Sequence, residues 1–475
     1  MDIVIINTFL ITLRGNGLGI IEDGAIGISD KKITFVGRTK ECNHKNYDMI
    51  IDGTNHVTLP GLINTHIHSG LTLLRGGAQD LPEIEWMNKG LGPFVKHLTP
   101  KDLVLGSKLG VLEGVRTGTT TFAEYSQNVS RIIKEVYIPF NVRVVAIETI
   151  NEISIDRSRL NPKDLYEFDH DKGISDLKRA NELFETYKNN EMVDSLYGPQ
   201  ALDMISLDLL HEVKRQATEK NTKLHMHVAQ GKRERIQIKG RYGIDTSTIS
   251  VLENESLLDK SLIAAHLHDT SAEERKLLVK RAVNMVGCPS SISMIDGIVP
   301  PINHYLELGG ISALGTDQAP GPGHHNLFQE MRMASVLTKV IQKDPTALPA
   351  WQSLKLGTIN GASVLGVSHK IGSLEVGKLA DVIMIDLLKI NLTPNIKKPF
   401  CNIIPNLIYS IKGNEVDNVI INGTIVLKDN QFTNINEESI IKEANERGKQ
   451  IFEKGTNDWL EAGSKMVSYS REGFI

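Results

Sequence analysis

The chain of 475 residues is poor in cysteine, and Cys42, Cys288 and Cys401 are the only three. Their number is odd, they are scattered, and none lies in a CxxC spacing. The sequence therefore supports neither a disulfide framework nor a thiolate metal site. Because free cysteines fit a reducing compartment, we expect a cytoplasmic location.

A strong charge of one sign and a long apolar run are also missing. The 53 Lys and Arg residues nearly cancel the 57 Asp and Glu residues, which leaves no broad basic field for nucleic acid and no acidic tail. No apolar stretch approaches the roughly 18 residues of a membrane span. The apolar residues 1–13 lack the basic start of a signal peptide and resemble a strand. We expect no nucleic-acid or membrane partner.

A regular alternation of strand and helix patterns runs from about residue 60 to 370. Helix starts include Thr99 followed by Pro100 and Asp102, and Ser271 followed by Glu274. Eight strand-like runs alternate with the helices, at 61–65, 119–124, 142–148, 193–197, 223–229, 262–265, 282–287 and 311–316. This order predicts an α/β fold, a (β/α)8 TIM barrel with its active site at the C-terminal ends of the strands.

Shorter strand patterns flank this region on both sides. Residues 1–58 alternate apolar and polar positions between turn signals, and similar runs return at 371–377, 380–386 and 416–427, the last with an Asn422-Gly423 hairpin turn. We expect both chain ends to form one small discontinuous β-sandwich. The predicted domains are an N-terminal segment of the β-sandwich (1–58), the catalytic barrel (59–370), a second segment of the same β-sandwich (371–430) and a C-terminal helical segment (431–475).

Five polar side chains at the predicted strand ends indicate one metal site; they are His66, His68, His227, His266 and Asp317. Residues two apart in a strand face the same side, so His66 and His68 can bind one ion together. His225 and His227 repeat this spacing, and we choose His227 because it lies nearer the C-terminal rim. A lone strand-end histidine is often structural and a lone aspartate is often a helix cap. Their coincidence at strands 1, 5, 6 and 8 favours a catalytic ion with an open position for water.

These motifs resemble a known family. The stretch 59–68, Leu-Pro-Gly-Leu-Ile-Asn-Thr-His-Ile-His, resembles the signature of the amidohydrolase superfamily. The stretches 72–76, 80–86, 118–121, 315–317 and 372–381 resemble its branch of methylthioadenosine/S-adenosylhomocysteine deaminases, guanine deaminase and triazine hydrolases. The likeness covers roughly residues 1–430.

The resemblance implies one divalent ion held by His66, His68, His227 and Asp317, with His266 beside the water or substrate. Zinc is the first expectation, although iron, nickel and manganese also suit such ligands. The ion would lower the pKa of its water to around 7. Asp317 would accept the water proton, and His266 would polarise the attacked centre or steady the tetrahedral intermediate. Relatives are usually homodimers or higher oligomers, and we expect the same here.

One departure from this branch concerns the proton carrier. The branch usually has Glu three residues after the strand-5 histidine, where this chain has Gln230. An amide can donate or accept a hydrogen bond but cannot shuttle a proton near neutral pH. Either another acid serves, with Glu124 and Glu234 as the candidates, or the reaction does not need one. Each of the two can equally be a surface or structural carboxylate.

Further departures concern the substrate. Gln200 stands where purine deaminases tend to have His after Gly-Pro, and residues 289–293 replace a Ser-Asn pattern. Together with Gln230, these changes weaken the case for an adenine-type substrate. They also alter the hydrogen bonds that the site offers to a base. Trp86 is a candidate for stacking on a planar substrate, with core packing as the alternative.

The sequence thus predicts a hydrolase of carbon–nitrogen bonds other than peptide bonds. The expected reaction is hydrolytic deamination of an amino-substituted nitrogen heterocycle of purine, pterin, pyrimidine or triazine type. A triazine-type chlorohydrolase or a cyclic amide hydrolase is the alternative enzyme. A non-catalytic barrel acting as a binding or assembly protein is the alternative of another class, and retention of all five polar groups argues against it.

Overall fold

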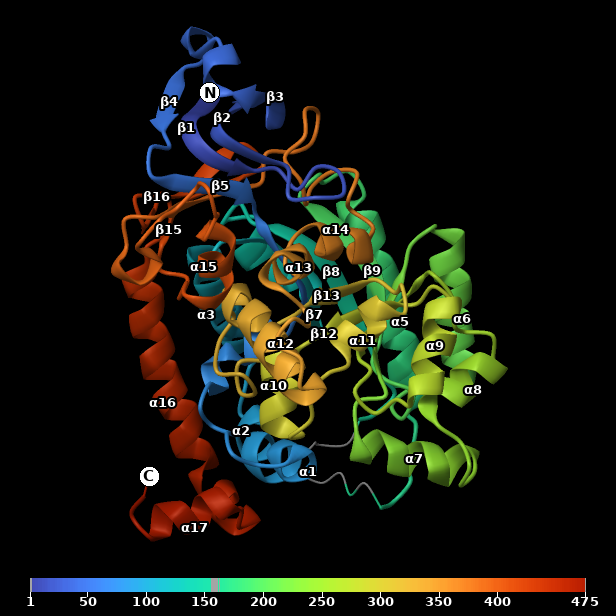
Figure 1. Cartoon of the computed structure of the whole chain (residues 1–475). Coiled ribbons are helices and arrows are strands. Elements are labelled where there is room, and N and C mark those ends of the chain that lie inside the picture. Colours follow the sequence, from blue (N-terminus) through green and yellow to red (C-terminus); the bar gives the residue numbers. More distant parts are fainter. Residues whose placement is uncertain (1, 155–160, 162, 475) are drawn as a thin grey trace.

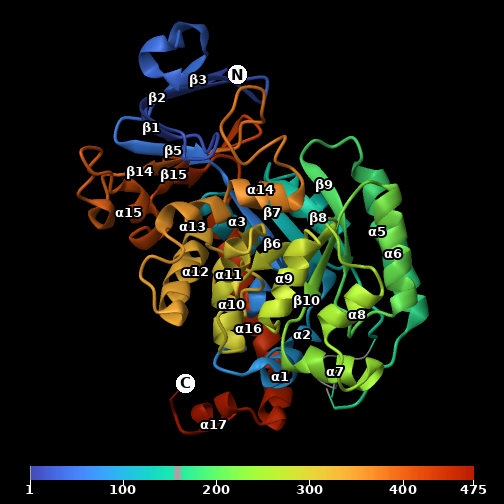
Figure 2. The ribbon, with the colours of Figure 1, turned by 45° about the vertical axis from the view of Figure 1, so that its right-hand side comes forward.

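The protein, described here from a computed structural model, combines a barrel with a smaller sheet at one end (Figure 1). The structure describes residues 2–154, 161 and 163–474. In both ribbon views the sheet lies at the opposite end of the barrel from α1 and α7 (Figures 1 and 2). No helix within the described ranges combines the length and apolarity needed to cross a membrane.

Eight parallel strands form the barrel, as predicted. Their pairing follows chain order from β6 to β13, and a parallel bridge between Ile67 and Asp317 joins the last strand region to the first. Every residue of β8 is buried, which fits the apolar run 144–147 at its centre, because parallel strands are covered on both faces. The strands are β6 (Leu62–Ile67), β7 (Thr119–Ser126), β8 (Arg143–Ile150), β9 (Val193–Pro199), β10 (Leu224–Val228), β11 (Leu262–His266), β12 (Asn284–Gly287) and β13 (Ser312–Leu314).

A glycine allows the barrel to close tightly. A Cβ atom on Gly315 would lie 2.6 Å from the Cβ and 2.8 Å from the carbonyl oxygen of His66, so any side chain there would clash. Across the same seam, the amide of Asn64 donates a 2.8 Å hydrogen bond to the hydroxyl of Thr316. The first and last strands are therefore held together beside the predicted site.

Helices surround the barrel strands. Both predicted capping boxes are present, Thr99 with Asp102 at the start of α3 and Ser271 with Glu274 at the start of α9. The helices are α1 (Glu83–Glu85), α2 (Gly92–Val95), α3 (Pro100–Arg116), α4 (Val129–Ile132), α5 (His170–Tyr187), α6 (Leu207–Glu219), α7 (Lys232–Tyr242), α8 (Thr248–Asn254), α9 (Ala272–Lys280), α10 (Pro289–Ile295), α11 (Ile302–Glu307), α12 (Leu327–Gln342), α13 (Ala350–Leu356), α14 (Ile359–Leu365), α15 (Ile403–Tyr409), α16 (Glu437–Ala462) and α17 (Lys465–Arg471). The C-terminal helix α16 packs against α2 and α3 along the side of the barrel (Figure 1).

Both chain ends build the smaller, mostly antiparallel sheet, which confirms the discontinuous β unit. Ile33 of β3 and Ile420 of β15, far apart in the strand order, share one buried cluster, so the sheet wraps around its own core like a sandwich. Positive φ angles at Asn422 (52°) and Gly423 (75°) form the predicted hairpin turn. The strands are β1 (Ile3–Ile11), β2 (Ile20–Ser29), β3 (Lys32–Arg38), β4 (Met49–Asp52), β5 (His56–Pro60), β14 (Val382–Asp386), β15 (Val416–Ile421), β16 (Thr424–Lys428) and β17 (Gln431–Phe432). The exact domain boundaries stay a prediction.

The strand predicted at residues 371–377 is wrong. This segment is a series of turns in which Gly372 and Gly377 both have φ of 94°. The amide of Leu374 bonds to the carbonyl of Thr12, and that of Gly377 bonds to the carbonyl of Ile33. The segment therefore bonds to β3 and to the residue that follows β1 without forming a ladder of its own.

A buried ion pair connects the barrel to the smaller sheet. The Arg143 guanidinium on β8 bonds to both carboxylate oxygens of Asp381, at 2.7 and 3.1 Å, and both side chains are almost fully buried. The backbone amide of Asn422 donates a further hydrogen bond of 2.8 Å to Asp381. This bidentate pair fixes the hairpin of the smaller sheet to the barrel.

Candidate metal centre

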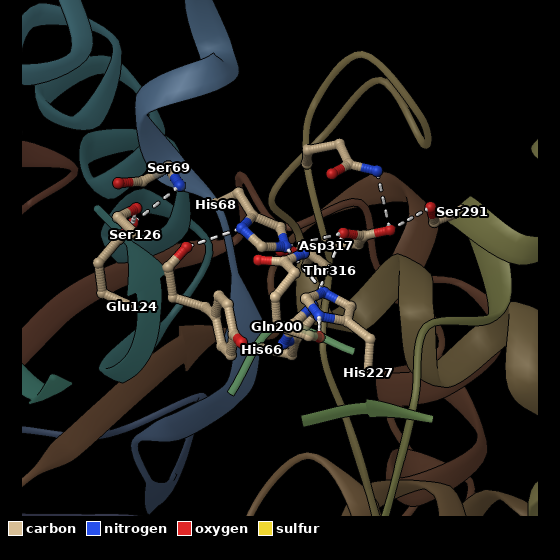
Figure 3. Close-up of polar contacts among 12 residues, drawn as sticks. His66, His68, Ser69, Glu124, Ser126, Gln200, His227, Ser291, Thr316 and Asp317 are labelled. Atoms are coloured by element: carbon tan, nitrogen blue, oxygen red, sulfur yellow. Dashed lines mark hydrogen bonds and ion pairs between the residues drawn. The ribbon is translucent and has the colours of Figure 1, made fainter. Parts of the chain in front are cut away.

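The C-terminal ends of four barrel strands bring the five predicted side chains together, and Figure 3 shows four of them, His66, His68, His227 and Asp317. The members are His66 and His68 from β6, His227 from β10, His266 from β11 and Asp317 just after β13. His266 and Asp317 have positive φ angles of 81° and 60°, which are rare for residues other than glycine. Such strained backbone collects at functional sites, where the surrounding structure enforces it.

Distances within the cluster fit a single small cation. Nε2 of His68 lies 3.4 Å from Nε2 of His227 and 3.5 Å from Oδ1 of Asp317. Nε2 of His66 lies 3.7 Å from the same Oδ1 atom. Ligands about 2.1 Å from a tetrahedral ion are separated by roughly 3.4 Å. The cluster therefore needs little rearrangement to coordinate an ion.

Backbone carbonyls orient two of the imidazoles. Nδ1 of His68 donates to the carbonyl of Tyr125 at 2.7 Å, and Nδ1 of His227 donates to the carbonyl of Gln200 at 2.8 Å. A ring nitrogen that faces a carbonyl carries the proton, so the lone pair of each ring is on Nε2. Both lone pairs thus lie on the atoms that face the cluster, as in metal sites whose histidines are held from behind.

His66 gives the clearest sign that a ligand is needed. The ring is completely buried, and neither nitrogen has a hydrogen-bond partner among the described residues. Burial, followed by the neighbouring histidines, holds its pKa well below the usual value. A neutral buried imidazole without a partner is costly, whereas an ion at its nitrogen would satisfy it. These residues therefore fit a bound divalent metal.

Two other histidines complete the imidazole cluster. The ring of His266 stacks on that of His227 with centroids 5.3 Å apart, and its nitrogen lies within 4.8 Å of those of His66 and His227. His225 lies below the site, where Nε2 contacts the carbonyl of Thr65 at 2.9 Å and the ring stacks on His66. His266 therefore adjoins the cluster, and His225 supports it from below.

Asp317 is fixed by a serine that the sequence did not single out for this role. The Ser291 hydroxyl donates a 2.6 Å hydrogen bond to Oδ2, and the Gln318 amide donates another of 3.1 Å. Oδ1 is the oxygen that faces His66 and His68. The two carboxylate oxygens thus face different groups. Oδ2 accepts the hydrogen bonds of Ser291 and Gln318, and Oδ1 faces the imidazoles.

Glu124, one of the two predicted acids, points away from the cluster. Figure 3 shows its carboxylate turned toward Ser69 and Ser126. It accepts hydrogen bonds from the Ser69 amide, the Ser126 hydroxyl and the Tyr137 hydroxyl, and it is completely buried. Glu124 does not line the cavity that opens onto the cluster. Its placement is that of a structural carboxylate.

Glu234, the second predicted acid, braces the loop that carries Gln230. Its carboxylate accepts hydrogen bonds from the backbone amides of Ala229 and Gln230 and from the Thr248 hydroxyl. Burial and the charge of Asp203 raise its pKa to about 7. Like Glu124, it is fully buried and does not line the cavity. It therefore bonds to other parts of the protein and does not face the substrate space.

A cavity of about 100 Å³ opens onto the cluster and receives all three predicted substrate contacts, Trp86, Gln200 and Gln230. Trp86 also packs in a hydrophobic cluster, and its indole nitrogen faces the carbonyl of Pro320 at 3.4 Å. The side-chain nitrogen of Gln230 has no partner within the described part of the chain, so it is available to a ligand. The other polar lining residues include Glu83, Arg233 and Asp296, which the sequence reasoning missed.

A larger cavity of about 400 Å³ adjoins the first. The two cavities share four lining residues, namely His68, Leu71, Gln200 and Met204. Aliphatic side chains such as Val95 and Leu98 cover part of the larger cavity. A substrate whose reacting carbon sits at the cluster therefore has room to extend a second group.

The fold and the site define a barrel hydrolase with a metal-binding His/Asp cluster. The chain belongs to the amidohydrolase family, whose model matches residues 57–426. A 5'-deoxyadenosine deaminase from Methanosarcina barkeri is 32% identical over 456 residues, which are 95% of this chain and 98% of the relative. A 5-methylthioadenosine/S-adenosylhomocysteine deaminase from Thermoanaerobacter pseudethanolicus is 31% identical and covers 96% of this chain and 100% of the relative.

A solved structure has the same fold. An adenosine deaminase from Xanthomonas campestris with bound zinc superimposes with a TM-score of 0.86 at 24% identity, covering 95% of this chain and 98% of that one. The barrel, the family and the hydrolase class predicted from the sequence are thus confirmed.

Proposed function

We propose that the protein is a zinc-dependent deaminase that hydrolyses the amino group of an adenosine-type heterocycle. The observation that carries this proposal is the cluster of neutral imidazoles around Oδ1 of Asp317, at the floor of the 100 Å³ cavity. The names of the two deaminases that match nearly the whole chain support the reaction. They also favour an adenosine-type substrate, although Gln200 and Gln230 taken from the sequence alone argued against one.

The proposed ligands are His66, His68, His227 and Asp317. A divalent ion bound there would lower the pKa of a water molecule to about 7 and so supply a nucleophile at neutral pH. Asp317 takes the proton of that water and later delivers it to the departing amine. Ser291 holds Oδ2 of the carboxylate, so that Oδ1 faces the imidazoles where this transfer takes place.

His266 adjoins the attacked carbon in this proposal. Burial holds its pKa well below the usual value, so the ring is neutral near pH 7. A neutral imidazole can donate a hydrogen bond to the oxygen that gains charge as the tetrahedral centre forms. Gln230 and Gln200 border the same space and can hydrogen-bond the edge of the heterocycle.

The adjoining 400 Å³ cavity suits the second part of a nucleoside-like substrate. Its lining mixes aliphatic side chains with the polar groups of Asn151 and Thr149. A free base would leave this volume empty, whereas a ribosyl group with a 5' substituent would use it. We therefore expect nucleosides to react better than free bases.

An ammonia-release screen tests the function. The substrates are 5'-deoxyadenosine, methylthioadenosine, S-adenosylhomocysteine, adenine, guanine, a pterin, an aminopyrimidine and an aminotriazine. Parallel readouts of chloride and of ring opening cover the alternative hydrolases. The proposal expects ammonia from at least one adenine nucleoside and none after Asp317→Asn. Chloride or ring opening without ammonia would contradict it. A cytoplasmic location and a homo-oligomeric state stay predictions.

A further inference from the structure

We propose that Asp296 is the general acid of this site and supplies the proton that Gln230 cannot carry. The inference rests on the proposed deamination, in which the ring nitrogen beside the attacked carbon gains a proton. It assigns a catalytic role to a residue outside every motif of the sequence analysis.

The cavity lining leaves few candidates. Its carboxylates are Asp317, Glu83 and Asp296. Asp317 belongs to the metal cluster. Glu83 is held by Arg233, whose backbone amide donates to it at 3.2 Å and whose Nε lies 3.4 Å from its Oε1 atom. Burial raises the pKa of Glu83, and Arg233 offsets part of this rise. Its carboxylate is nevertheless occupied by the ion pair and hydrogen bond with Arg233, which makes it a poorer proton donor than an unpaired carboxyl group. Asp296 remains.

Asp296 lines the same cavity as the metal cluster. It directly follows α10, whose Ser291 binds Asp317. Five residues of helix rise about 7.5 Å along the axis, and helical side chains lean back toward the N-terminus, so the Asp296 carboxylate leans toward the end of α10 that holds Asp317. Ser291, Ile292, Ile295 and Asp296 all line the cavity, so one side of α10 borders the substrate space from the metal cluster to this carboxylate.

The Asp296 carboxylate has no hydrogen-bond partner in the chain as far as the structure describes it. The ring of His268 faces it, with Nε2 3.8 Å from Oδ2 of Asp296. A glycine keeps this space open, because a Cβ on Gly231 would lie 3.2 Å from Oδ1 of Asp296 and 3.3 Å from Nε2 of His268. Gly231 follows Gln230, so the space beside Asp296 lies next to the amide side chain that cannot carry a proton.

The surroundings bring the pKa of Asp296 close to neutral pH. Burial raises its pKa to about 7, with help from the nearby carboxylates of Glu83, Asp317 and Asp269, and Arg233 offsets part of the rise. A bound ion would leave burial, the largest cause, in place. Burial also lowers the pKa of His268 to about 4, so His268 contributes no positive charge near pH 7. A donor with its pKa near the working pH is the most effective one.

The proton balance closes with these groups. As water attacks the carbon that carries the amine, one water proton passes to Asp317 and Asp296 gives its proton to the adjacent ring nitrogen. The carbon–nitrogen double bond of the ring becomes single. Asp317 then protonates the amine, the carbon–amine bond breaks, and ammonia leaves. The remaining hydroxyl proton returns to Asp296 as the new carbonyl forms.

The test compares the holoenzyme with Asp296→Asn and Asp296→Ala in ammonia release, with the metal content measured in each. We expect kcat at pH 7 to fall at least about 100-fold with little change in KM and an unchanged ion content. The decline of wild-type kcat above about pH 7 should vanish in Asp296→Asn. Formate should restore part of the activity of Asp296→Ala, which a merely structural role would not allow.

Asp344→Asn is the matched control, because Asp344 is an exposed carboxylate after α12 that bonds to Thr346 outside the cavity. It should keep kcat within about twofold. An Asp296→Asn protein with more than a third of the wild-type kcat at pH 7 would overturn the inference, as would a loss of activity that formate does not rescue. A wild-type holoenzyme that releases no ammonia from any substrate would instead refute the proposed function.

Discussion

The hydroxyl of Ser291 on α10 donates a 2.6 Å hydrogen bond to Oδ2 of Asp317, while Oδ1 faces the imidazoles of His66 and His68. One serine thus decides which carboxylate oxygen is available to the metal cluster. It also ties α10, which carries Asp296 at its end, to the strand-end residue that closes the barrel.

Ser291→Ala should lower kcat by about tenfold, since a hydrogen bond to a charged group contributes roughly 1.5–3 kcal/mol and part of this is retained by Gln318. The metal content should stay near that of the wild type. Steady-state kinetics with metal analysis measure both quantities. Ser293→Ala is the control, because that hydroxyl donates to the carbonyl of Ile298 away from the site. Equal kinetics for the two variants would show that Ser291 does not orient Asp317.

Glu124→Gln should reduce stability more than turnover. The carboxylate accepts three hydrogen bonds in a fully buried place, and an amide would direct its NH2 group at donors. The expected cost is about 1–3 kcal/mol in the free energy of unfolding, with kcat within about tenfold of the wild type. Denaturant unfolding and ammonia release check the two parts. A loss of turnover by orders of magnitude with unchanged stability would contradict the structural role and indicate that Glu124 carries a proton in the reaction.

Arg143→Ala should destabilise the protein by about 3–5 kcal/mol, because it leaves Asp381 buried and uncompensated between barrel and sheet. Denaturant unfolding measures the change. Arg131→Ala provides the comparison, since the Arg131–Glu135 pair is exposed and should contribute less than about 1 kcal/mol. Similar effects of both substitutions would mean that the buried pair does not hold the two units together.

Removal of the ion should lower the melting temperature as well as abolish activity. The unpartnered nitrogens of His66 gain a ligand only when the ion is bound, and binding to the folded state alone stabilises that state. Calorimetry before and after chelation, followed by addition of zinc, iron, nickel or manganese, measures the effect and ranks the ions. A melting temperature that chelation and metal addition leave unchanged would contradict metal binding by the folded cluster.

Much of the barrel was predictable because its strands are short apolar runs between helix signals. The five residues at the strand ends followed from that register, since the C-terminal ends of all barrel strands meet at one rim. Residues 371–377 misled the prediction because their backbone amides bond singly to Thr12 and Ile33, a pairing between segments distant in sequence.

The rest of the site depends on tertiary packing. Glu124 and Glu234 stand near the right strands in the sequence, but side-chain direction and burial turn both toward the chain. Glu83 lies inside the stretch 80–86 and Asp296 directly follows α10, but only the folded barrel brings both carboxylates to the cavity. Ser291 was part of a noted departure, yet its bond to Asp317 becomes visible only in three dimensions.

The central claim is that distant strand ends hold one ion. Anomalous diffraction from crystals of the active holoenzyme, recorded on both sides of the absorption edge of the metal found in solution, tests it most directly. The account predicts one peak per chain, within coordination distance of His66, His68, His227 and Asp317. A fully active crystal with no peak at that position, or with its only peak elsewhere in the molecule, would contradict it.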